Sequence, residues 1–393
     1  MTEQFTRRDA LGGALTTAAL LAAPGPARAV GVGVRWAEVD HLARAMTAEH
    51  IVPGVSIAAG RAGRPTYARG FGMANLETGT LVTPESVFHI GSITKQFTAA
   101  AIVLLAADGK LALDDKLSRF FPQVPRANEI TLRQMLTHTA GLGNYTDRKP
   151  LLAFLVSSRL DYDRDALLAD MLAHTDPFFI GAPGAQWAYS NTGYVLLGLI
   201  VEKVSGIFYG AFFEQRLFAP AGLTQTAVDD LSAVVPHRAS GYSGHAGSDT
   251  AFDNAAYISM TYPGGAGSMR STPRDLCRWH TALLGGRILP PNGLKAMLTP
   301  VRLANGAQPI AILGPGGPKP VSYGFGIELK RFEGHATVEH GGGIFGFASD
   351  LRSFPVEQVS VAMIVNFDGQ GHPSFPERFT ALKDAAARAS LAA

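Results

Sequence analysis

A serine and a lysine lie three positions apart at Ser92 and Lys95, a spacing that can support nucleophilic catalysis. Apolar residues recur after Ser92 at the spacing of one helix face, so we expect a helix from about residue 92 to 108. Residues three apart on a helix share a face, with Cβ atoms about 5–6 Å apart. A serine hydroxyl needs a base, and burial near the positive end of a helix lowers a lysine pKa. The pair predicts a lysine-activated serine, although a serine that merely caps a helix gives the same pattern.

A second polar group, Tyr189-Ser190-Asn191, precedes a predicted helix at 193–204. A tyrosinate held near cations can act as a general base, and an asparagine amide can orient a substrate carbonyl. Alternatively, Ser190 or Asn191 caps the following helix and Tyr189 packs on the surface. These three residues alone leave both interpretations open.

A third group, His340-Gly341-Gly342, follows a predicted strand at 337–340. Glycines let a substrate backbone lie against a strand edge, and a histidine supplies a hydrogen-bond donor beside it. The pattern His-x-Gly also occurs at His89 and His245, so only position distinguishes this copy. A polar strand end before a tight turn is the alternative interpretation.

Strand patterns cluster at both ends of the chain and helical patterns in the middle. The strand-like runs are 55–60, 66–72, 324–330, 337–340, 347–354 and 359–366. Helical spacing is clearest at 36–46, 130–138, 151–156, 166–173, 193–204, 209–217 and 376–386. We therefore predict an α/β fold with two lobes: an antiparallel sheet built from both termini and flanked by helices, plus a mostly helical lobe. The α/β lobe would take about 30–95 and 260–393, and the helical lobe about 96–259.

Together, the three groups resemble the motifs of the serine β-lactamase and penicillin-binding-protein superfamily. The most similar branch contains class C β-lactamases, D-alanyl-D-alanine carboxypeptidases and related esterases. Further matching segments fall in the family's order across roughly residues 38–385. They are Phe-His-Ile-Gly at 88–91, Leu-Thr-His-Thr-Ala-Gly-Leu at 136–142, Pro-Gly at 183–184 and Ser-Thr-Pro-Arg-Asp-Leu at 271–276. A chance occurrence of several motifs in this order is far less expected than a chance occurrence of any single motif, so the set supports the resemblance.

The resemblance implies a catalytic role for four of these residues. Ser92 would attack the acyl carbonyl and become acylated, while Lys95 and Tyr189 would move its proton to the leaving group. The backbone N–H groups of Ser92 and Gly343 would form the oxyanion hole. A water would then release the product, at a site between the two lobes.

The resemblance also implies substrate-binding residues. Asn191 would hold the substrate amide or the lysine, and His340, Gly341 and Gly342 would line the substrate. β-Lactamases usually carry Lys-Thr-Gly in that third place, and its cation and hydroxyl suit the carboxylate of penicillins and cephalosporins. A histidine is only partly charged near neutral pH. We therefore expect an esterase or a peptidase acting on D-amino-acid substrates rather than a dedicated class C-like β-lactamase.

Two further functions are compatible with the same residues. One is a non-catalytic envelope protein that binds peptidoglycan-like ligands, and the other is an acyltransferase, in which an amine or alcohol replaces water. Other hydrolase classes lack support, since no G-x-S-x-G or H-E-x-x-H string occurs. The acids Asp161, Asp163 and Asp165 lack the glycine and glutamate that a calcium loop requires. We predict no metal and no cofactor.

Composition and the N-terminal residues indicate where the protein acts and which partners it can bind. The 393 residues carry a formal net charge of +2, which gives no electrostatic signature for nucleic acid or an anionic membrane. Residues 1–29 have the pattern of an export signal, which we expect to be absent from the mature fold. Arg7 and Arg8 precede an uncharged stretch, as in twin-arginine signals, and Ala-Arg-Ala at 27–29 fits a cleavage site. We expect one exported domain over 30–393, periplasmic or secreted, with a small-molecule or peptide substrate and no stable membrane anchor. The lone Cys277 is expected to be buried and inert, and the oligomeric state stays open.

Overall fold

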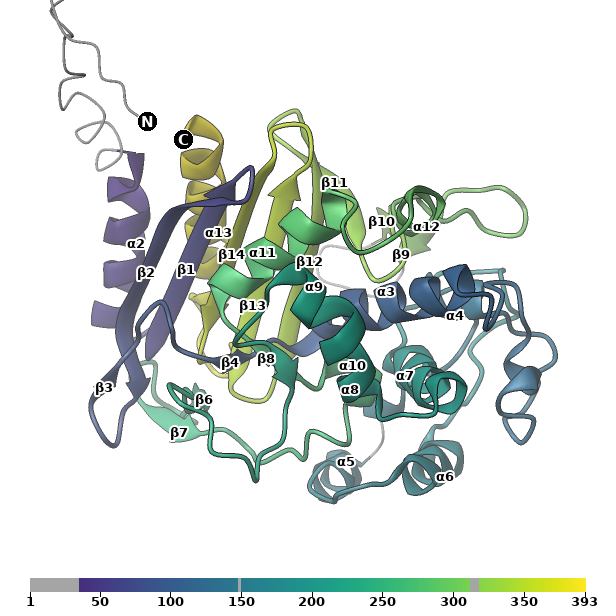
Figure 1. Ribbon diagram of the computed structural model, residues 1–393. Coiled ribbons are helices and arrows are strands. Elements are labelled where there is room, and N and C mark those ends of the chain that lie inside the picture. Colours follow the sequence, from purple (N-terminus) through teal and green to yellow (C-terminus); the bar gives the residue numbers. More distant parts are fainter. Residues whose placement is uncertain (1–34, 148–149, 312–317) are drawn as a thin grey trace, which may run out of the picture.

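A seven-stranded antiparallel sheet forms one side of the molecule in the computed structural model, which describes residues 35–147, 150–311 and 318–393 (Figure 1). The strand order is β11-β12-β13-β14-β1-β2-β3. The strands are β1 (Gly54–Arg61), β2 (Arg64–Asn75), β3 (Thr80–Leu81), β11 (Glu328–Phe332), β12 (His335–Ile344), β13 (Phe347–Phe354) and β14 (Val359–Val365). β1 pairs with β14 from Val55 opposite Val365 to Arg61 opposite Val359. The predicted sheet built from both termini is therefore confirmed.

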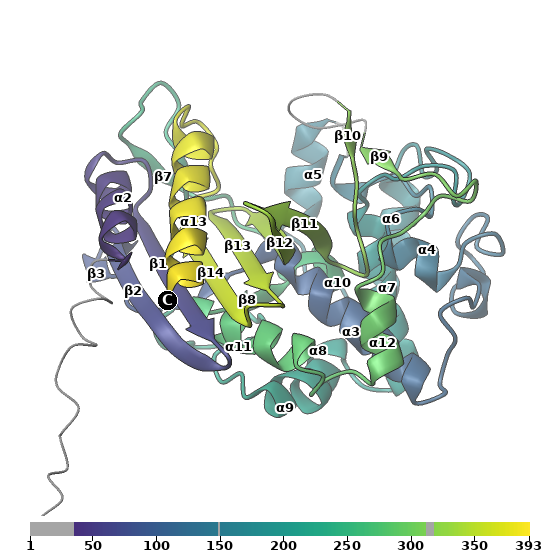
Figure 2. The ribbon, with the colours of Figure 1, turned by 90° about the horizontal axis from the view of Figure 1, so that it is seen from above.

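Helices cover both faces of this sheet. The terminal helices α2 (Ala37–Ala48) and α13 (Phe375–Ala392) lie side by side on one face (Figure 2). Val55 and Ile57 of β1 join their core, while Ala58 belongs to the core on the opposite face, because successive strand residues alternate between faces. That opposite face carries α11 (Pro273–Leu284), which packs against β1 and β14. On α11, Cys277 is buried, and burial raises the pKa of its thiol to about 12.

Two apolar helices, α3 (Thr94–Ala107) and α7 (Asn191–Ser205), pack together in the helical lobe. The Ser190 side chain accepts a hydrogen bond from the Gly193 N–H and so caps α7. The short α10 (Gly264–Gly267) contacts both helices. A Cβ on Gly265 would lie only 2.9 Å from the Gly198 Cα, so only glycines permit this approach. The remaining helices include α4 (Leu132–Leu136), α5 (Leu151–Ser157), α6 (Arg164–His174), α8 (Tyr209–Phe213), α9 (Ala219–Ala221) and α12 (Pro291–Met297).

The predicted division into an α/β lobe (about 30–95 and 260–393) and a helical lobe (about 96–259) stays a prediction. Helices α10 and α12, which it would assign to the α/β lobe, both contact α3. The export signal predicted over 1–29 lies outside the described residues. Among the described residues, no single helix has the length and hydropathy to span a membrane. Two consecutive helical segments, Asn191–Ser205 and Tyr209–Ala221, reach that length and hydropathy only when they are taken together, and the chain bends by 78° between them.

Two predicted strands near the third motif need correction. The strand expected at 324–330 begins later, as β11, because Gly326 has a φ of 68° and the Gly324 N–H donates to the Ile327 carbonyl (2.8 Å) in a turn. The strand expected at 337–340 continues to Ile344 as β12. His340, Gly341 and Gly342 therefore lie inside a strand and not at its end.

Candidate active site

Ser92 and Lys95 lie at the start of α3, in the arrangement that their spacing predicts. Ser92 is in a 3₁₀ turn, Gly91–Ile93, that leads directly into the helix. The Lys95 ammonium nitrogen lies 3.0 Å from Ser92 Oγ, 2.8 Å from Asn191 Oδ1 and 2.8 Å from the Ala266 carbonyl oxygen. Lys95 is completely buried, and this burial holds its pKa well below the usual value.

Burial favours the neutral amine of Lys95, and its three contacts can accommodate that form as well as an ammonium. A neutral amine has two N–H donors and one lone pair. Asn191 Oδ1 and the Ala266 carbonyl can only accept hydrogen bonds, so they take the two N–H groups. The lone pair then faces the Ser92 hydroxyl, which can donate to it. Lys95 is thus placed and poised to accept the Ser92 proton.

Tyr189 lies against the same lysine. Its ring centroid is 4.8 Å from Lys95 Nζ, and its hydroxyl hydrogen-bonds with Ser92. Burial raises the pKa of Tyr189, and the hydrogen bond with Ser92 offsets this only in part. At neutral pH the phenol therefore keeps its proton, which suits a hydrogen-bond donor better than the tyrosinate base considered from sequence.

The Asn191 side chain is held on both sides. Its Nδ2 donates to Thr146 Oγ1 (3.2 Å), and its Oδ1 accepts from Lys95. Its backbone N–H donates to Asn144 Oδ1 (3.0 Å). Of the two roles expected for Asn191, the structure shows the contact with the lysine.

An open strand edge lies beside Ser92. β11 pairs with β12 only as far as Glu339, so no described strand pairs with the outer edge of 340–344. Gly91 has a φ of 50°, and a Cβ there would lie 2.8 Å from the Gly343 carbonyl oxygen. This close approach brings the Ser92 backbone beside Gly343, where the oxyanion hole was expected.

His340 lies behind this edge and not on it. The side chain is 4% exposed and does not line the cavity that contains Ser92. Its Nδ1 lies 2.6 Å from the Gly341 carbonyl oxygen, and its Nε2 lies 2.9 Å from the Tyr323 hydroxyl. Burial lowers the pKa of His340 to about 4. The histidine is therefore neutral and its nitrogens are already bonded, which corrects the expectation that it offers a donor to substrate.

The cavity at Ser92 is apolar and uncharged. It has a volume of about 240 Å³, and Ser92, Asn191 and Gly343 open onto it. No charged side chain is among its described lining residues, which are mostly apolar or aromatic: Tyr145, Phe154, Ile258, Tyr262, Ile344 and Phe345. Within the described ranges, no group of three or more His, Cys, Asp or Glu side chains is placed to hold a metal ion.

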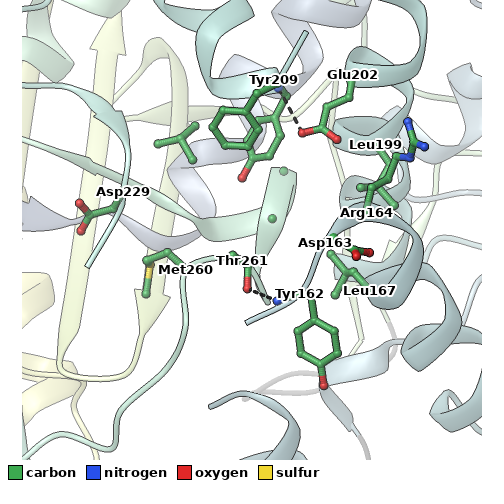
Figure 3. Close-up of a pocket in the computed structure, with 14 residues that line it drawn as sticks. Tyr162, Asp163, Arg164, Leu167, Leu199, Glu202, Tyr209, Asp229, Met260 and Thr261 are labelled. Atoms are coloured by element: carbon green, nitrogen blue, oxygen red, sulfur yellow. Dashed lines mark hydrogen bonds between the residues drawn. The ribbon is translucent and has the colours of Figure 1, made fainter. Parts of the chain in front are cut away.

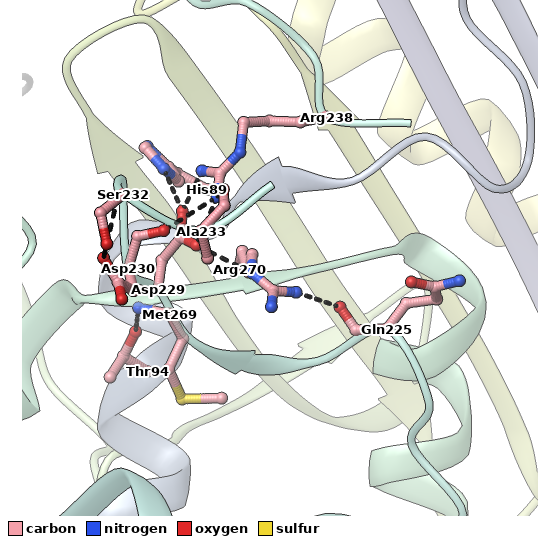
Figure 4. A network of polar contacts seen from close by, with 10 residues as sticks. All are labelled: His89, Thr94, Gln225, Asp229, Asp230, Ser232, Ala233, Arg238, Met269 and Arg270. Carbon is pink, nitrogen blue, oxygen red and sulfur yellow. Dashed lines mark hydrogen bonds and ion pairs between the residues drawn. The ribbon is translucent and has the colours of Figure 1, made fainter. Parts of the chain in front are cut away.

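A buried carboxylate, Asp229, fixes the strand that leads into Ser92 (Figure 4). It accepts hydrogen bonds from His89 Nε2 (2.7 Å), from both terminal nitrogens of Arg238 (2.6 and 3.0 Å) and from Arg270 Nε (2.8 Å). His89 lies in β4 (Phe88–His89), which pairs with β8 (Met269–Ser271) opposite Arg270. Burial raises the pKa of Asp229, but its hydrogen bonds with His89 and Arg238 outweigh burial and leave the pKa lowered. The ionised carboxylate thus anchors the chain three residues before Ser92.

A second cavity, of about 80 Å³, lies next to the segment before α10 (Figure 3). Met260 and Thr261 line it, together with Glu202, which accepts a hydrogen bond from the Tyr209 N–H (3.3 Å). Ser92 is not among its lining residues. This second cavity therefore does not contain the candidate nucleophile.

Sequence reasoning missed several residues of the site. Ala266 supplies a carbonyl to Lys95, and Tyr262 lines the cavity. The run Tyr-Pro-Gly-Gly-Ala-Gly at 262–267 was a usable signal, because clustered glycines mark close backbone approach. Tyr145 and Thr146 lie just beyond the 136–142 segment, and only that proximity hinted at them. No local pattern distinguished Tyr323.

Known proteins are similar to this chain in sequence and architecture. A model of the Beta-lactamase family matches residues 39–387. Penicillin-binding protein 4* of Bacillus subtilis (strain 168) is 32% identical over 305 residues, which cover 75% of this chain. The match covers 64% of that relative, so the chain spans less than two thirds of its length.

Two solved structures are similar over nearly their whole length. A D-stereospecific amidohydrolase from Streptomyces sp. has a TM-score of 0.72 and 29% identity, covering 89% of this chain and 98% of that one. A D-amino acid amidase from Ochrobactrum anthropi SV3, complexed with L-phenylalanine amide, has a TM-score of 0.76 and 26% identity, with coverage of 90% and 98%.

Proposed function

Because this chain belongs to the beta-lactamase family of serine hydrolases, we propose that it hydrolyses esters and amides whose acyl group has an apolar side chain and no carboxylate, including those of D-amino acids. The observation that carries the proposal is the cavity at Ser92, which is lined by aromatic and aliphatic side chains and, among its described residues, by no charged one. A free carboxylate on the acyl group would lose its hydration there without gaining a cation.

The proposed reaction uses the contacts around Ser92 in sequence. The Ser92 hydroxyl donates its proton to the neutral Lys95 amine as Oγ attacks the acyl carbonyl. The backbone N–H groups of Ser92 and Gly343 stabilise the oxyanion. The Tyr189 hydroxyl, which bonds with Ser92, helps return the proton to the departing amine or alcohol. Water then attacks the acyl-Ser92 ester, and the same groups run the steps in reverse.

Two observations favour D-amino-acid substrates over β-lactams. The position of the usual Lys-Thr-Gly lysine holds His340, which is buried and neutral, so it offers no charge to a penicillin carboxylate. The similar solved structures are described as a D-stereospecific amidohydrolase and a D-amino acid amidase.

A matched set of substrates tests the proposal. D-phenylalanine amide, L-phenylalanine amide, p-nitrophenyl butyrate and nitrocefin would be compared by kcat/KM. We expect turnover of the D-amide and of the ester, at least about tenfold above the L-amide, within the usual range for enzymes. Nitrocefin turnover above about 10⁵ M⁻¹s⁻¹ with untouched esters would instead establish a β-lactamase. Absence of turnover and of any covalent adduct would favour a non-catalytic binder.

The aromatic wall of the cavity predicts a specificity variant. Phe345 lines the cavity and contacts Phe154 edge to face at 6.0 Å between ring centroids. In Phe345→Ala, we expect KM for the D-phenylalanine amide to rise about tenfold or more, since burying an aromatic group contributes roughly 1.5–3 kcal/mol. KM for a p-nitrophenyl acetate ester should change less than about threefold, because the acetyl group is too small to reach this wall.

Phe208→Ala is the matched control for that variant. Phe208 lines the cavity of about 80 Å³ that lacks Ser92, and it is 55% exposed. Its removal should leave both KM values unchanged. Equal effects of the two variants on the amide, or no effect of Phe345→Ala, would contradict binding of the acyl group at the Ser92 cavity.

A further inference from the structure

A chain of hydrogen bonds connects the second and third motifs behind the active site. The Ser190 backbone N–H lies 3.1 Å from His138 Nδ1. His138 Nε2 lies 3.2 Å from the Tyr323 hydroxyl, which lies 2.9 Å from His340 Nε2. His340 Nδ1 lies 2.6 Å from the Gly341 carbonyl oxygen. His138, Tyr323 and His340 are all buried.

The two ends of this chain fix the state of one ring nitrogen in each histidine. The Ser190 N–H can only donate, so His138 Nδ1 must accept, and the His138 proton is on Nε2. The Gly341 carbonyl can only accept, so His340 Nδ1 carries a proton, and because burial lowers the pKa of His340 to about 4, its Nε2 is bare. The Tyr323 hydroxyl therefore accepts from His138 and donates to His340. This assignment satisfies His138, Tyr323 and His340 together, with both histidines neutral and in opposite tautomers.

This arrangement also explains why His340 supplies no cation at the site. A proton added to His138 Nδ1 would oppose the Ser190 N–H, and one added to His340 Nε2 would oppose the Tyr323 O–H. The nearest charged groups on β11 do not replace that cation, because Glu328 and Lys330 pair with each other.

The chain joins segments that are far apart in sequence. His138 has a φ of 59° and its ring lies 4.4 Å from the Tyr189 ring, between centroids. It follows α4, whereas Tyr323 precedes β11 and His340 lies in β12. The loop that carries Tyr189 and the glycine edge at Gly341 are thereby held at a fixed separation.

We propose that His138 and Tyr323 are positioning residues, which hold His340 as the neutral Nδ1–H tautomer and so align the Gly341–Gly343 edge with Tyr189 for leaving groups that carry no carboxylate. The preference for leaving groups rests on the proposed function, whereas the proton arrangement does not. The preferred substrate class is therefore peptides and amides whose departing amine is uncharged, such as a glycinamide.

Nitrogen-15 NMR of the histidine-labelled protein tests the arrangement directly. Long-range ¹H–¹⁵N spectra distinguish a bare ring nitrogen from a protonated one, and His138→Asn and His340→Gln provide the assignments. We expect His138 as the Nε2–H tautomer and His340 as the Nδ1–H tautomer at neutral pH. A charged His340, or the same tautomer for both rings, would overturn the proposal whether or not a substrate is known.

Removing the Tyr323 hydroxyl tests whether the hydrogen-bonded chain affects catalysis at Ser92. In Tyr323→Phe, His340 Nε2 loses its donor, so its tautomer signals should change. Labelling of Ser92 by an uncharged fluorophosphonate, and kcat for an accepted ester, should fall about 10-fold to 100-fold, with KM changed less than about threefold. His138→Asn keeps an acceptor for the Ser190 N–H and tolerates the positive φ, so it should fold but show the same loss.

Tyr242→Phe is the matched control. Tyr242 is also buried, and its hydroxyl accepts one hydrogen bond, from the Leu76 N–H at 2.8 Å. This variant should leave the His340 tautomer and the labelling rate unchanged. Wild-type labelling and unchanged tautomers in Tyr323→Phe would refute the positioning role.

A pair of dipeptides separates the substrate class from the positioning role. D-phenylalanyl-glycinamide should exceed D-phenylalanyl-glycine in kcat/KM by at least about tenfold, since the carboxylate finds no cation. A preference for the free carboxylate would overturn the substrate class. If neither dipeptide is cleaved while p-nitrophenyl butyrate is, the proposed amidase activity fails, and the labelling and NMR results alone decide the positioning role.

Discussion

Ser92→Ala should lose turnover of every substrate, by at least about 10⁴-fold in kcat, and should keep the fold. The Ser92 hydroxyl is the nucleophile in the proposed reaction, so its removal leaves no group to carry the acyl intermediate. The side chain does not cap the helix that it precedes, and it contacts Lys95 at 3.0 Å. Initial rates with p-nitrophenyl butyrate and a thermal unfolding curve measure the two effects.

Ser56→Ala is the control for a lost buried hydroxyl. Ser56 is buried in β1, and its hydroxyl donates to the Thr83 carbonyl at 3.4 Å, away from the Ser92 cavity. It should retain near-normal activity. If Ser92→Ala folds and keeps more than about one hundredth of the wild-type kcat, another residue is the nucleophile.

Lys95→Met should lower kcat by at least about 10³-fold and, at the same time, make the protein more stable. Methionine keeps an unbranched apolar side chain in the buried space but cannot accept the Ser92 proton. The pKa of Lys95 is lowered by burial in the folded protein, so the unfolded chain binds more protons at neutral pH. Wild-type stability should therefore rise with pH up to the usual lysine pKa, and the advantage of the variant should shrink over that range. Unfolding curves across pH measure this.

Lys203→Met provides the comparison on a neighbouring helix. Lys203 lies near the end of α7, and its ammonium donates to the Phe120 carbonyl outside the site. Its kcat should stay near that of the wild type. If Lys95→Met retained more than about one tenth of the activity, Lys95 would not be the base, and Tyr189 would be the remaining candidate.

Local periodicity was sufficient to predict the sheet and the Ser92–Lys95 pair. Both depend on residue spacing within one element, which sequence displays directly. The sequence could not show that Lys95 is fully buried, because its burial depends on distant segments. The Ala266 carbonyl that it contacts is 171 positions away, and α7 supplies Asn191. Such long-range packing decides whether the lysine is a solvated cation or a neutral base.

The third motif shows where local patterns fail. Glycine disfavours strands, so the predicted strand ended at His340, yet β12 continues through three glycines to Ile344. A Cβ on Gly342 would lie 2.0 Å from the Ile90 carbonyl, so tertiary contact overrides the local preference. The sequence also did not show that His340 is bonded inside the protein. Its partner Tyr323 lies 17 positions earlier, outside the three motifs, and carries no signature of its own.

The acyl-Ser92 intermediate is tested most directly by intact mass spectrometry of the protein quenched shortly after addition of p-nitrophenyl butyrate, followed by peptide mapping. We expect a transient butyryl mass on the peptide that contains Ser92, which forms and decays at rates consistent with kcat and is absent from Ser92→Ala. Turnover of the ester with no adduct, or with the adduct on a different residue, would contradict it.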